Sequence, residues 1–97
     1  MDKKQFKLKV NDTFDKIFLL LEKKEDDSRF EYEDNGEIIE IKYKQQNCAI
    51  NFHRINEQIW VASNIDGAFH FDYDADKDRW ITSYGVELFD TLNRILK

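Results

Sequence analysis

Apolar and polar residues alternate through the middle of this chain, and this period of two limits the folds that the chain can form. The apolar positions of four successive runs are Ile39, Ile41 and Tyr43; Cys48, Ile50 and Phe52; Ile59 and Val61; and Phe69, Phe71 and Tyr73. Side chains alternate between the two faces of a β-strand, so each run predicts a strand with one buried and one solvent-facing side. The chain is therefore expected to build a sheet that needs a second layer on one face only.

Short turn signals separate these runs and predict consecutive antiparallel strands. Strands are expected at about 30–33, 38–43, 47–53, 57–63 and 67–73, with a short one around 80–82. Asn35-Gly36 predicts a hairpin with a type I′ turn, because Asn and Gly tolerate the positive φ that this turn demands. Strands joined by short turns usually pair with their sequence neighbours, which predicts a meander.

Apolar residues at helical spacing lie on both sides of the predicted strands. Before them, the set is Phe6, Val10, Phe14, Ile17, Phe18 and Leu21, which predicts a helix over roughly 3–24. After them, Val86, Phe89, Leu92 and Ile95 predict a final helix, for which Ser83 is the candidate N-cap. The predicted fold is α+β: a two-layer α/β sandwich whose antiparallel sheet of five to six strands has both terminal helices packed on one face.

Length and composition predict one domain, spanning residues 1–97. The chain has no proline, no repeat and no Gly/Ser-rich linker, so no internal boundary is visible. A single cysteine allows no internal disulfide, which fits a reducing compartment. No apolar stretch approaches the ~20 residues of a membrane span, and the first residues resemble neither a signal peptide nor a transit peptide. The expectation is a cytoplasmic or matrix-like soluble protein.

Negative charge is concentrated in one part of the chain. The net charge is −5, and segment 22–40 holds nine acidic and three basic residues, so this segment accounts for the whole excess. Such a field disfavours nucleic acid as a partner and favours cations or a basic protein surface. The alternative is that these charges have no binding role and simply form a solvated face beside an ordinary hairpin.

The carboxylates of this segment are candidate metal ligands. They are Glu22, Glu25, Asp26, Asp27, Glu31 and Glu33. Glu22, Glu25 and Asp26 would share one helix face if the first helix continued through them. Hard cations such as iron prefer oxygen ligands, and the segment contains no His or Cys. Weak binding at several sites is therefore expected, not a closed metal cage.

Trp60 is expected on the solvent-facing side of the sheet. Ile59 and Val61 take the buried positions of the same strand, so Trp60 points the other way. The same outer face should carry Lys42, Asn51, His53, Gln58, Trp60 and His70. A large aromatic in such polar company is often a binding anchor, and this interpretation is favoured; the alternative is cover by neighbouring side chains or by a dimer contact. No catalytic triad or nucleophile stands out, so no catalytic residue is predicted.

Three other features are expected to be structural. The run from Asp72 to Asp78 resembles the start of an EF-hand loop, but Lys77 stands where that loop needs Gly, so an acidic turn is predicted. Cys48 shares the buried parity of Ile50 and should behave as a small hydrophobic residue. Trp80 is expected in the core or under the final helix.

Several of these motifs together resemble the frataxin family, specifically its bacterial CyaY branch. The most specific match is Ile50-Asn51 followed by Gln58-Ile59-Trp60. The other matching parts are Asn35-Gly36, Gly67-x-x-His-Phe-Asp72, Trp80 and Gly85-x-x-Leu-Phe-x-x-Leu92. The resemblance covers nearly the whole chain from about residue 15. It implies a helix–meander–helix sandwich, which agrees with the periodicity.

The resemblance implies iron-dependent assistance or regulation of iron–sulfur cluster assembly. Family members bind Fe²⁺ or Fe³⁺ weakly through an acidic ridge at the end of the first helix and the start of the first strand, which corresponds to Glu22–Glu33. They dock on the cysteine desulfurase and scaffold protein through this ridge and the exposed sheet face. On that face the implied partner-binding residues are Asn51, Gln58, Trp60 and His70. The implied location is the bacterial cytoplasm, or the mitochondrial matrix for a processed form.

The main hypothesis is therefore a non-enzymatic iron-binding adaptor, monomeric unless iron drives it into oligomers, with no nucleic-acid or membrane partner. An enzymatic alternative is ferroxidase-like oxidation and storage of iron at paired carboxylates. A third hypothesis is an acidic interaction module that works without metal. Lys23 and Arg29 stand where bacterial members often carry acids, so a thinner ridge and a lower iron affinity are expected.

Overall fold

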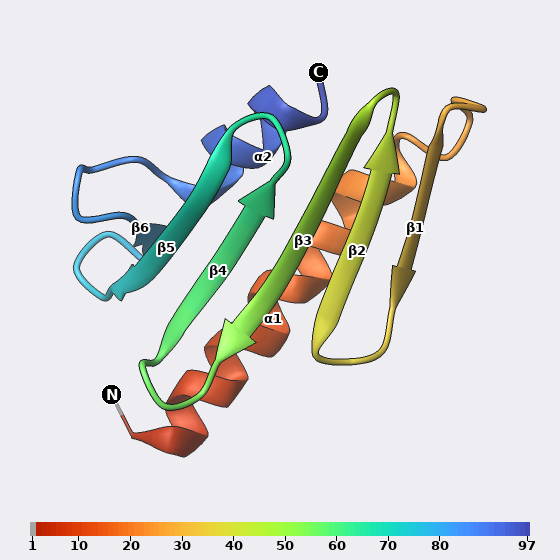
Figure 1. Cartoon of the computed structure of the whole chain (residues 1–97). Helices are drawn as coiled ribbons and strands as arrows, with labels where there is room; N and C mark the ends of the chain where they lie inside the picture. Colours follow the sequence, from red (N-terminus) through yellow and green to blue (C-terminus); the bar gives the residue numbers. More distant parts are fainter. Residues whose placement is uncertain (1) are drawn as a thin grey trace.

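Two helices and six strands form the computed structural model, which describes residues 2–97. In chain order they are α1 (Lys3–Glu22), β1 (Phe30–Asp34), β2 (Ile38–Tyr43), β3 (Gln46–His53), β4 (Gln58–Ser63), β5 (Gly67–Asp74), β6 (Arg79–Ile81) and α2 (Leu88–Ile95). The strands make one sheet in the order β1-β2-β3-β4-β5-β6, and each is antiparallel to the next. This is the predicted meander (Figure 1).

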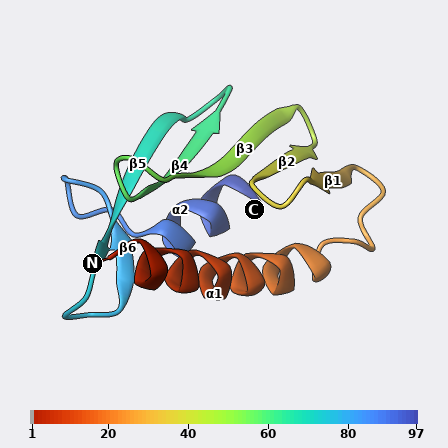
Figure 2. The same cartoon turned by 90° about the horizontal axis from the view of Figure 1, so that it is seen from below.

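Both helices lie on the same side of the sheet, and α1 runs along the length of the molecule (Figure 2). The predicted α+β sandwich is therefore confirmed. The structure places no helix or strand of residues 2–97 over the opposite face, which is called the outer face below. Neither helix in this range has both the length and the apolar composition that crossing a membrane requires.

Helix α1 begins at a capped N-terminus and buries one face. The Asp2 carboxylate accepts a hydrogen bond of 2.8 Å from the backbone N–H of Gln5, and the Gln5 side chain accepts one in return from the Asp2 N–H. This reciprocal capping box satisfies two free donors of the first turn. The buried residues follow the predicted spacing and are Phe6, Val10, Thr13, Phe14, Ile17 and Leu21.

The core lies between the helices and the alternating apolar positions of the strands. Ile50, Ile59 and Phe71, on three neighbouring strands, have no exposed surface. Their burial is worth about 1.5–3 kcal/mol for each side chain relative to leaving it in water. Leu88 and Leu92 of α2 are equally buried and close the core from the helix side.

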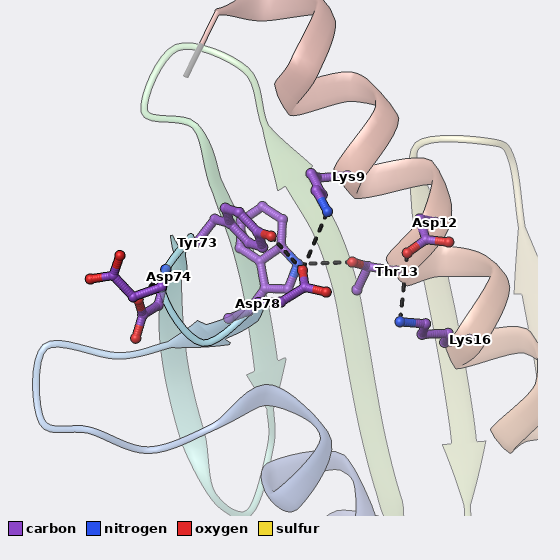
Figure 3. Close-up of polar contacts among 9 residues, drawn as sticks. Lys9, Asp12, Thr13, Lys16, Tyr73, Asp74 and Asp78 are labelled. Carbon is purple, nitrogen blue, oxygen red and sulfur yellow. Dashed lines mark hydrogen bonds and ion pairs between the residues drawn. The ribbon is translucent and has the colours of Figure 1, made fainter.

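Polar contacts attach α1 to the end of the sheet formed by β5 and β6 (Figure 3). The buried indole N–H of Trp80 donates to Thr13 Oγ1 at 2.8 Å. Nearby, Lys9 Nζ lies 3.3 Å from Asp78 Oδ1, and the Tyr73 hydroxyl donates to the same carboxylate. Trp80 is thus a core residue on the α1 side, and Asp78 belongs to an acidic turn, as expected.

The hairpin between β1 and β2 is present, but its predicted type I′ turn is wrong. Only Gly36 has a positive φ there, +89°, whereas a type I′ turn needs two such residues. The side chain of Asn35 is used as an acceptor instead: its Oδ1 receives the backbone N–H groups of Glu37 and Ile38.

The predicted cap of the final helix is also wrong. Helix α2 starts at Leu88, and the Glu87 carboxylate accepts the N–H groups of Phe89 and Asp90. Ser83 lies in the preceding loop, which Thr82 closes by accepting two backbone N–H groups through its hydroxyl and donating its own N–H to Val86. This loop uses the residues that the sequence pattern assigned to the first helical turn.

Candidate functional site

The four predicted partner-binding residues lie together on the outer face. Asn51 of β3, Trp60 of β4 and His70 of β5 are directly opposite one another in the strand register and form one row across the sheet. Gln58 lies two positions along β4 from Trp60, on the same face. Residues directly opposite in a sheet have Cβ atoms about 4.5–5.5 Å apart, so this row is a continuous surface.

Trp60 is held between two imidazole rings. His53 stacks on one side with ring centroids 4.2 Å apart, and His70 stacks on the other at 4.1 Å, both nearly parallel to the indole. Neighbouring side chains thus cover both faces of the indole, as the predicted alternative had it, and Trp60 is half-buried. The stack therefore leaves the edge of the indole, and not its faces, for contact with another molecule. Sequence reasoning placed both histidines on this face but did not predict the stack.

Hydrogen bonds fix the orientation of the indole within this stack. The Trp60 Nε1–H donates to Gln58 Oε1 at 2.8 Å, and Gln58 Nε2 donates to Asp72 Oδ1 at 3.0 Å. The side chain is therefore rigid before any partner arrives. An aromatic group that is already fixed loses little conformational entropy on binding, which favours its use as an anchor.

A row of small side chains runs beside the Trp60 row. Ala49, Ala62 and Ala68 are directly opposite one another on β3, β4 and β5. The same row continues to Glu40 on β2 and Glu33 on β1. The carboxylates on and beside the edge strand β1, called the acidic edge below, include Glu31, Glu33 and Glu40. Methyl side chains leave the sheet surface low and flat between this edge and the Trp60 stack, which leaves room for close approach by a partner.

The acidic segment surrounds β1, the edge strand of the sheet, but its six candidate ligands do not form one patch. Helix α1 ends at Glu22, and the chain then turns: the Lys24 N–H donates to Leu21 O, and the Asp27 N–H to Lys24 O. The predicted helical face shared by Glu22, Glu25 and Asp26 is therefore not formed, because Glu25 and Asp26 lie in these turns.

Glu22 and Glu25 lie near the inner side of β1. The pKa of the Tyr32 hydroxyl is raised, first by burial and then by the negative charges of Glu25 and Glu22. Tyr32 packs toward α1, with its ring 6.3 Å from that of Phe18. These two carboxylates therefore lie on the helix side of the sheet edge.

Asp27 is already occupied by contacts within the protein. Its carboxylate receives Arg29 Nε at 3.0 Å and a guanidinium nitrogen at 2.8 Å, together with the Tyr43 hydroxyl at 3.1 Å. The bonds from Arg29 hold the pKa of Asp27 far below its usual range. A cation would have to displace Arg29 to use both oxygens, so Asp27 fits a structural role better than the predicted metal-binding one.

Glu31 and Glu33 lie on the outer side of β1. Glu31 faces Lys42 across the strands, an attractive pair, whereas Glu33 faces Glu40. Glu33, Asp34, Asn35, Ile38 and Glu40 line a small hollow of about 130 Å³. Sequence reasoning did not include Glu40 among the ligands. The predicted two-residue turn at Asn35-Gly36 would have paired Glu33 with Ile38, whereas the observed register pairs Glu33 with Glu40.

Within residues 2–97, no three side chains of His, Cys, Asp or Glu are grouped closely enough to hold a metal ion together. The acidic edge thus offers pairs of oxygen ligands on two sides of β1. Chemically, such pairs suit weak and exchangeable binding of a hard cation that keeps much of its water.

Cys48 is a core residue and does not belong to this surface. It is buried, and burial together with the charge of Asp66 raises the pKa of its thiol to about 11. The thiol is therefore protonated at neutral pH and acts as an apolar core group, as the sequence predicts.

Comparison with known proteins gives the same fold and a family. A model of the frataxin-like domain matches residues 1–97. The iron-sulfur cluster assembly protein CyaY of Thioalkalivibrio sulfidiphilus is 40% identical over 67 residues, which are 68% of this chain and 52% of that protein. The CyaY protein of Pseudomonas fluorescens is 44% identical over 41 residues, which are 41% of this chain and 36% of that protein. The chain thus aligns with about half or less of the length of these relatives.

A solved structure, the frataxin of Psychromonas ingrahamii, superposes with a TM-score of 0.83 over 98% of this chain and 88% of that one. Its sequence identity of 22% supports the shared fold alone. The family model, by contrast, covers every residue of the sequence. The chain belongs to the frataxin family.

Proposed function

We propose that this chain is an adaptor of iron–sulfur cluster assembly that binds iron weakly and docks on a cysteine desulfurase and its scaffold protein in the bacterial cytoplasm. The curated relatives are bacterial proteins named for iron–sulfur cluster assembly, which supports the pathway. One observation carries the docking proposal. The row from Glu33 and Glu40 through Ala49, Ala62 and Ala68 joins the acidic edge to the face that carries Trp60.

Two parts of this surface would contribute differently to docking. The carboxylates along β1 would attract a basic partner at long range and raise the association rate, an effect that salt screens. The Trp60 stack would provide the short-range contact, because rigid aromatic anchors contribute most of the affinity at many interfaces. The alanine row between them would let the partner contact both parts at once.

The iron proposal rests on the like-charge pair of Glu33 and Glu40. Two carboxylates that face each other repel, and a bound cation removes this repulsion while gaining oxygen ligands. Glu31, on the same side of β1, is next to this pair along the strand. Iron here would be cargo, held weakly enough to be passed on.

Titration followed by NMR tests both parts. We would record ¹H–¹⁵N spectra of the chain with Fe²⁺ added under anaerobic conditions and, separately, with a bacterial cysteine desulfurase. Fe²⁺ should broaden residues around Glu33 and Glu40, and the desulfurase should shift the β1 edge together with the Trp60 row. The double variant Glu33→Gln and Glu40→Gln should lose the iron effect, whereas Glu57→Gln, on the β3–β4 turn, should keep it. Footprints elsewhere in the molecule would contradict the proposal.

A metal-independent adaptor is the second candidate, favoured by the absence of a grouped ligand set within the described residues. The two candidates differ in one measurement. If desulfurase binding is equally strong in the presence of a chelator and of added Fe²⁺, docking works without metal. If Fe²⁺ changes the affinity, and Glu40→Gln removes that change, iron is part of the mechanism.

A further inference from the structure

The end of the molecule opposite the acidic edge is basic. Between Asp2 and Val10 the chain carries Lys3, Lys4, Lys7 and Lys9 against one acidic residue. These lysines lie on the first turns of α1, beside the turn that joins β3 to β4 (Figure 1). The same turn contributes Arg54.

The lysines lie at the end of α1 where the helix dipole is unfavourable for positive charge. The N-terminus of a helix carries partial positive charge, so each cation there costs up to about 0.3–1 kcal/mol. The free backbone amides are already served by Asp2 and Gln5 in the capping box. Lys9 pairs with Asp78, but within residues 2–97 no carboxylate forms an ion pair with Lys3, Lys4 or Lys7. Within the described residues these three charges thus have no carboxylate partner, so an anionic ligand could neutralise them.

An apolar hollow of about 460 Å³ opens between these lysines and the β3–β4 turn. It is lined by Lys3, Phe6, Lys7, Phe52, Arg54, Ile55 and Glu57. Its apolar floor is formed by the rings of Phe6 and Phe52, whose centroids are 6.5 Å apart. Hollows of this volume commonly accept small ligands or one or two side chains of a partner.

The rim of this hollow combines positive charge with one projecting apolar side chain. Ile55, at the tip of the turn, is 90% exposed, and the Arg54 guanidinium lies over the Phe52 ring at 5.5 Å. Arg54 also pairs with Glu37 at 3.4 Å, an exposed contact that water and salt weaken. Three cations, Lys3, Lys7 and Arg54, therefore surround an apolar floor, with Glu57 as the one carboxylate in the lining.

We propose that this basic hollow binds an acidic peptide segment of a partner protein, with one apolar side chain of that segment seated on Phe6 and Phe52. Charge complementarity selects the acidic segment, since its carboxylates replace the counter-charges that the lysines lack. The concave floor and Ile55 select an apolar side chain within it. The hollow borders the proposed docking surface, since Arg54 follows His53 of the Trp60 stack and pairs with Glu37 of the β1–β2 turn. The proposal is nevertheless distinct, because the lining of the hollow contains none of the residues proposed to bind iron or the desulfurase.

The test uses the full chain and a short fluorescein-labelled peptide rich in glutamate that carries one leucine and one phenylalanine. Binding is followed by fluorescence anisotropy at low and at physiological salt. We expect saturable binding that weakens with salt. Replacing the apolar residues of the peptide by serine, or its glutamates by glutamine, should each weaken binding by about tenfold or more.

The decisive variant is K3E/K7E. Acids at a helix N-terminus are favourable, so this variant should unfold at the same or a higher temperature than the wild type while losing peptide binding. K16E/K23E makes the same change of net charge farther along α1 and should keep binding. Ile55→Ser, at an exposed position, should fold normally and bind the peptide several-fold more weakly. Unchanged binding by K3E/K7E would overturn the proposal.

Two other outcomes would also overturn it. The lysines could instead bind an anionic membrane. The wild-type chain would then co-sediment with phosphatidylglycerol vesicles, K3E/K7E would not, and the peptide would bind to neither protein. They could instead meet the acidic edge of another copy of the chain. Concentration-dependent sedimentation coefficients that become constant in K3E/K7E, without peptide binding, would show that.

Discussion

Glu33 on β1 lies directly opposite Glu40 on β2, so two carboxylates face each other on the outer surface of the sheet. The neighbouring position on the same two strands carries an attractive pair, Glu31 opposite Lys42. The strand geometry therefore accommodates opposite charges at this edge, and the like-charge pair lowers stability without a packing reason. A stabilising substitution at this position should reduce cation binding.

Glu40→Lys is expected to raise the free energy of unfolding by roughly 0.2–1 kcal/mol, because it converts a repulsive cross-strand pair into an attractive one. Urea denaturation monitored by circular dichroism measures this change. Lys42→Glu is the matched control and should lower stability by a similar amount, since it creates a second like-charge pair with Glu31. A Glu40→Lys variant that is less stable than the wild type would contradict the prediction.

Thr13→Val should destabilise the protein by about 1–3 kcal/mol, because the buried Trp80 N–H then loses its acceptor while the shape of the side chain is kept. Thr13→Ser keeps the hydroxyl and should recover much of the stability, apart from the loss of one methyl group. Urea denaturation of the three proteins gives both values. Equal stability of the Val and wild-type proteins would mean that the hydrogen bond adds nothing.

The Asp27–Arg29 pair should make stability depend on pH in the acid range. The pKa of Asp27 is lower in the folded protein than in the unfolded chain. The pair therefore stabilises the folded state fully above the unfolded-state pKa of about 3.9, and this stabilisation is lost as the pH falls toward the pKa of the folded state. Asp27→Asn should therefore be less stable than the wild type at pH 6, and the difference should shrink below about pH 4. Thermal unfolding at stepped pH measures it. A difference that does not change with pH would argue against the pair.

Cys48 should resist thiol reagents in the folded state. Its thiol is buried and its pKa is raised to about 11, so both access and thiolate population are low at pH 8. Reaction with DTNB should proceed at the rate at which the protein opens and should become fast in denaturing urea. Rapid stoichiometric labelling of the native protein would show that Cys48 is accessible.

The strands and both helices were predictable because each is amphipathic over several turns or residue pairs. The parity of Ile59 and Val61 was enough to place Trp60 on the outer face. Register was the missing information: the line of Asn51, Trp60 and His70 depends on which residues face one another across strands. Alternation gives the face of a residue, but turn geometry decides its partner.

The end of α1 and the start of α2 were less predictable because local polar contacts decide them. Helical spacing would have allowed α1 to pass Glu22, yet the chain turns there and Asp27 forms its pair with Arg29 two residues later. The His53–Trp60–His70 stack depends on side-chain rotamers across three strands, which no linear pattern records. The acidic character of the edge was visible in the sequence, but its division between two sides of β1 was not.

The charged character of β1 also affects how copies of this protein behave in concentrated solution. An edge strand presents unpaired backbone donors and acceptors that can pair with the edge of another sheet and begin aggregation. Three of the five residues of β1, namely Glu31, Glu33 and Asp34, are carboxylates, and their charge disfavours such pairing. At the other edge, β6 has only three residues and is followed by a bridge from Ile81 to Glu87. Electrostatic repulsion at one edge and a short, covered strand at the other keep this open sheet from growing.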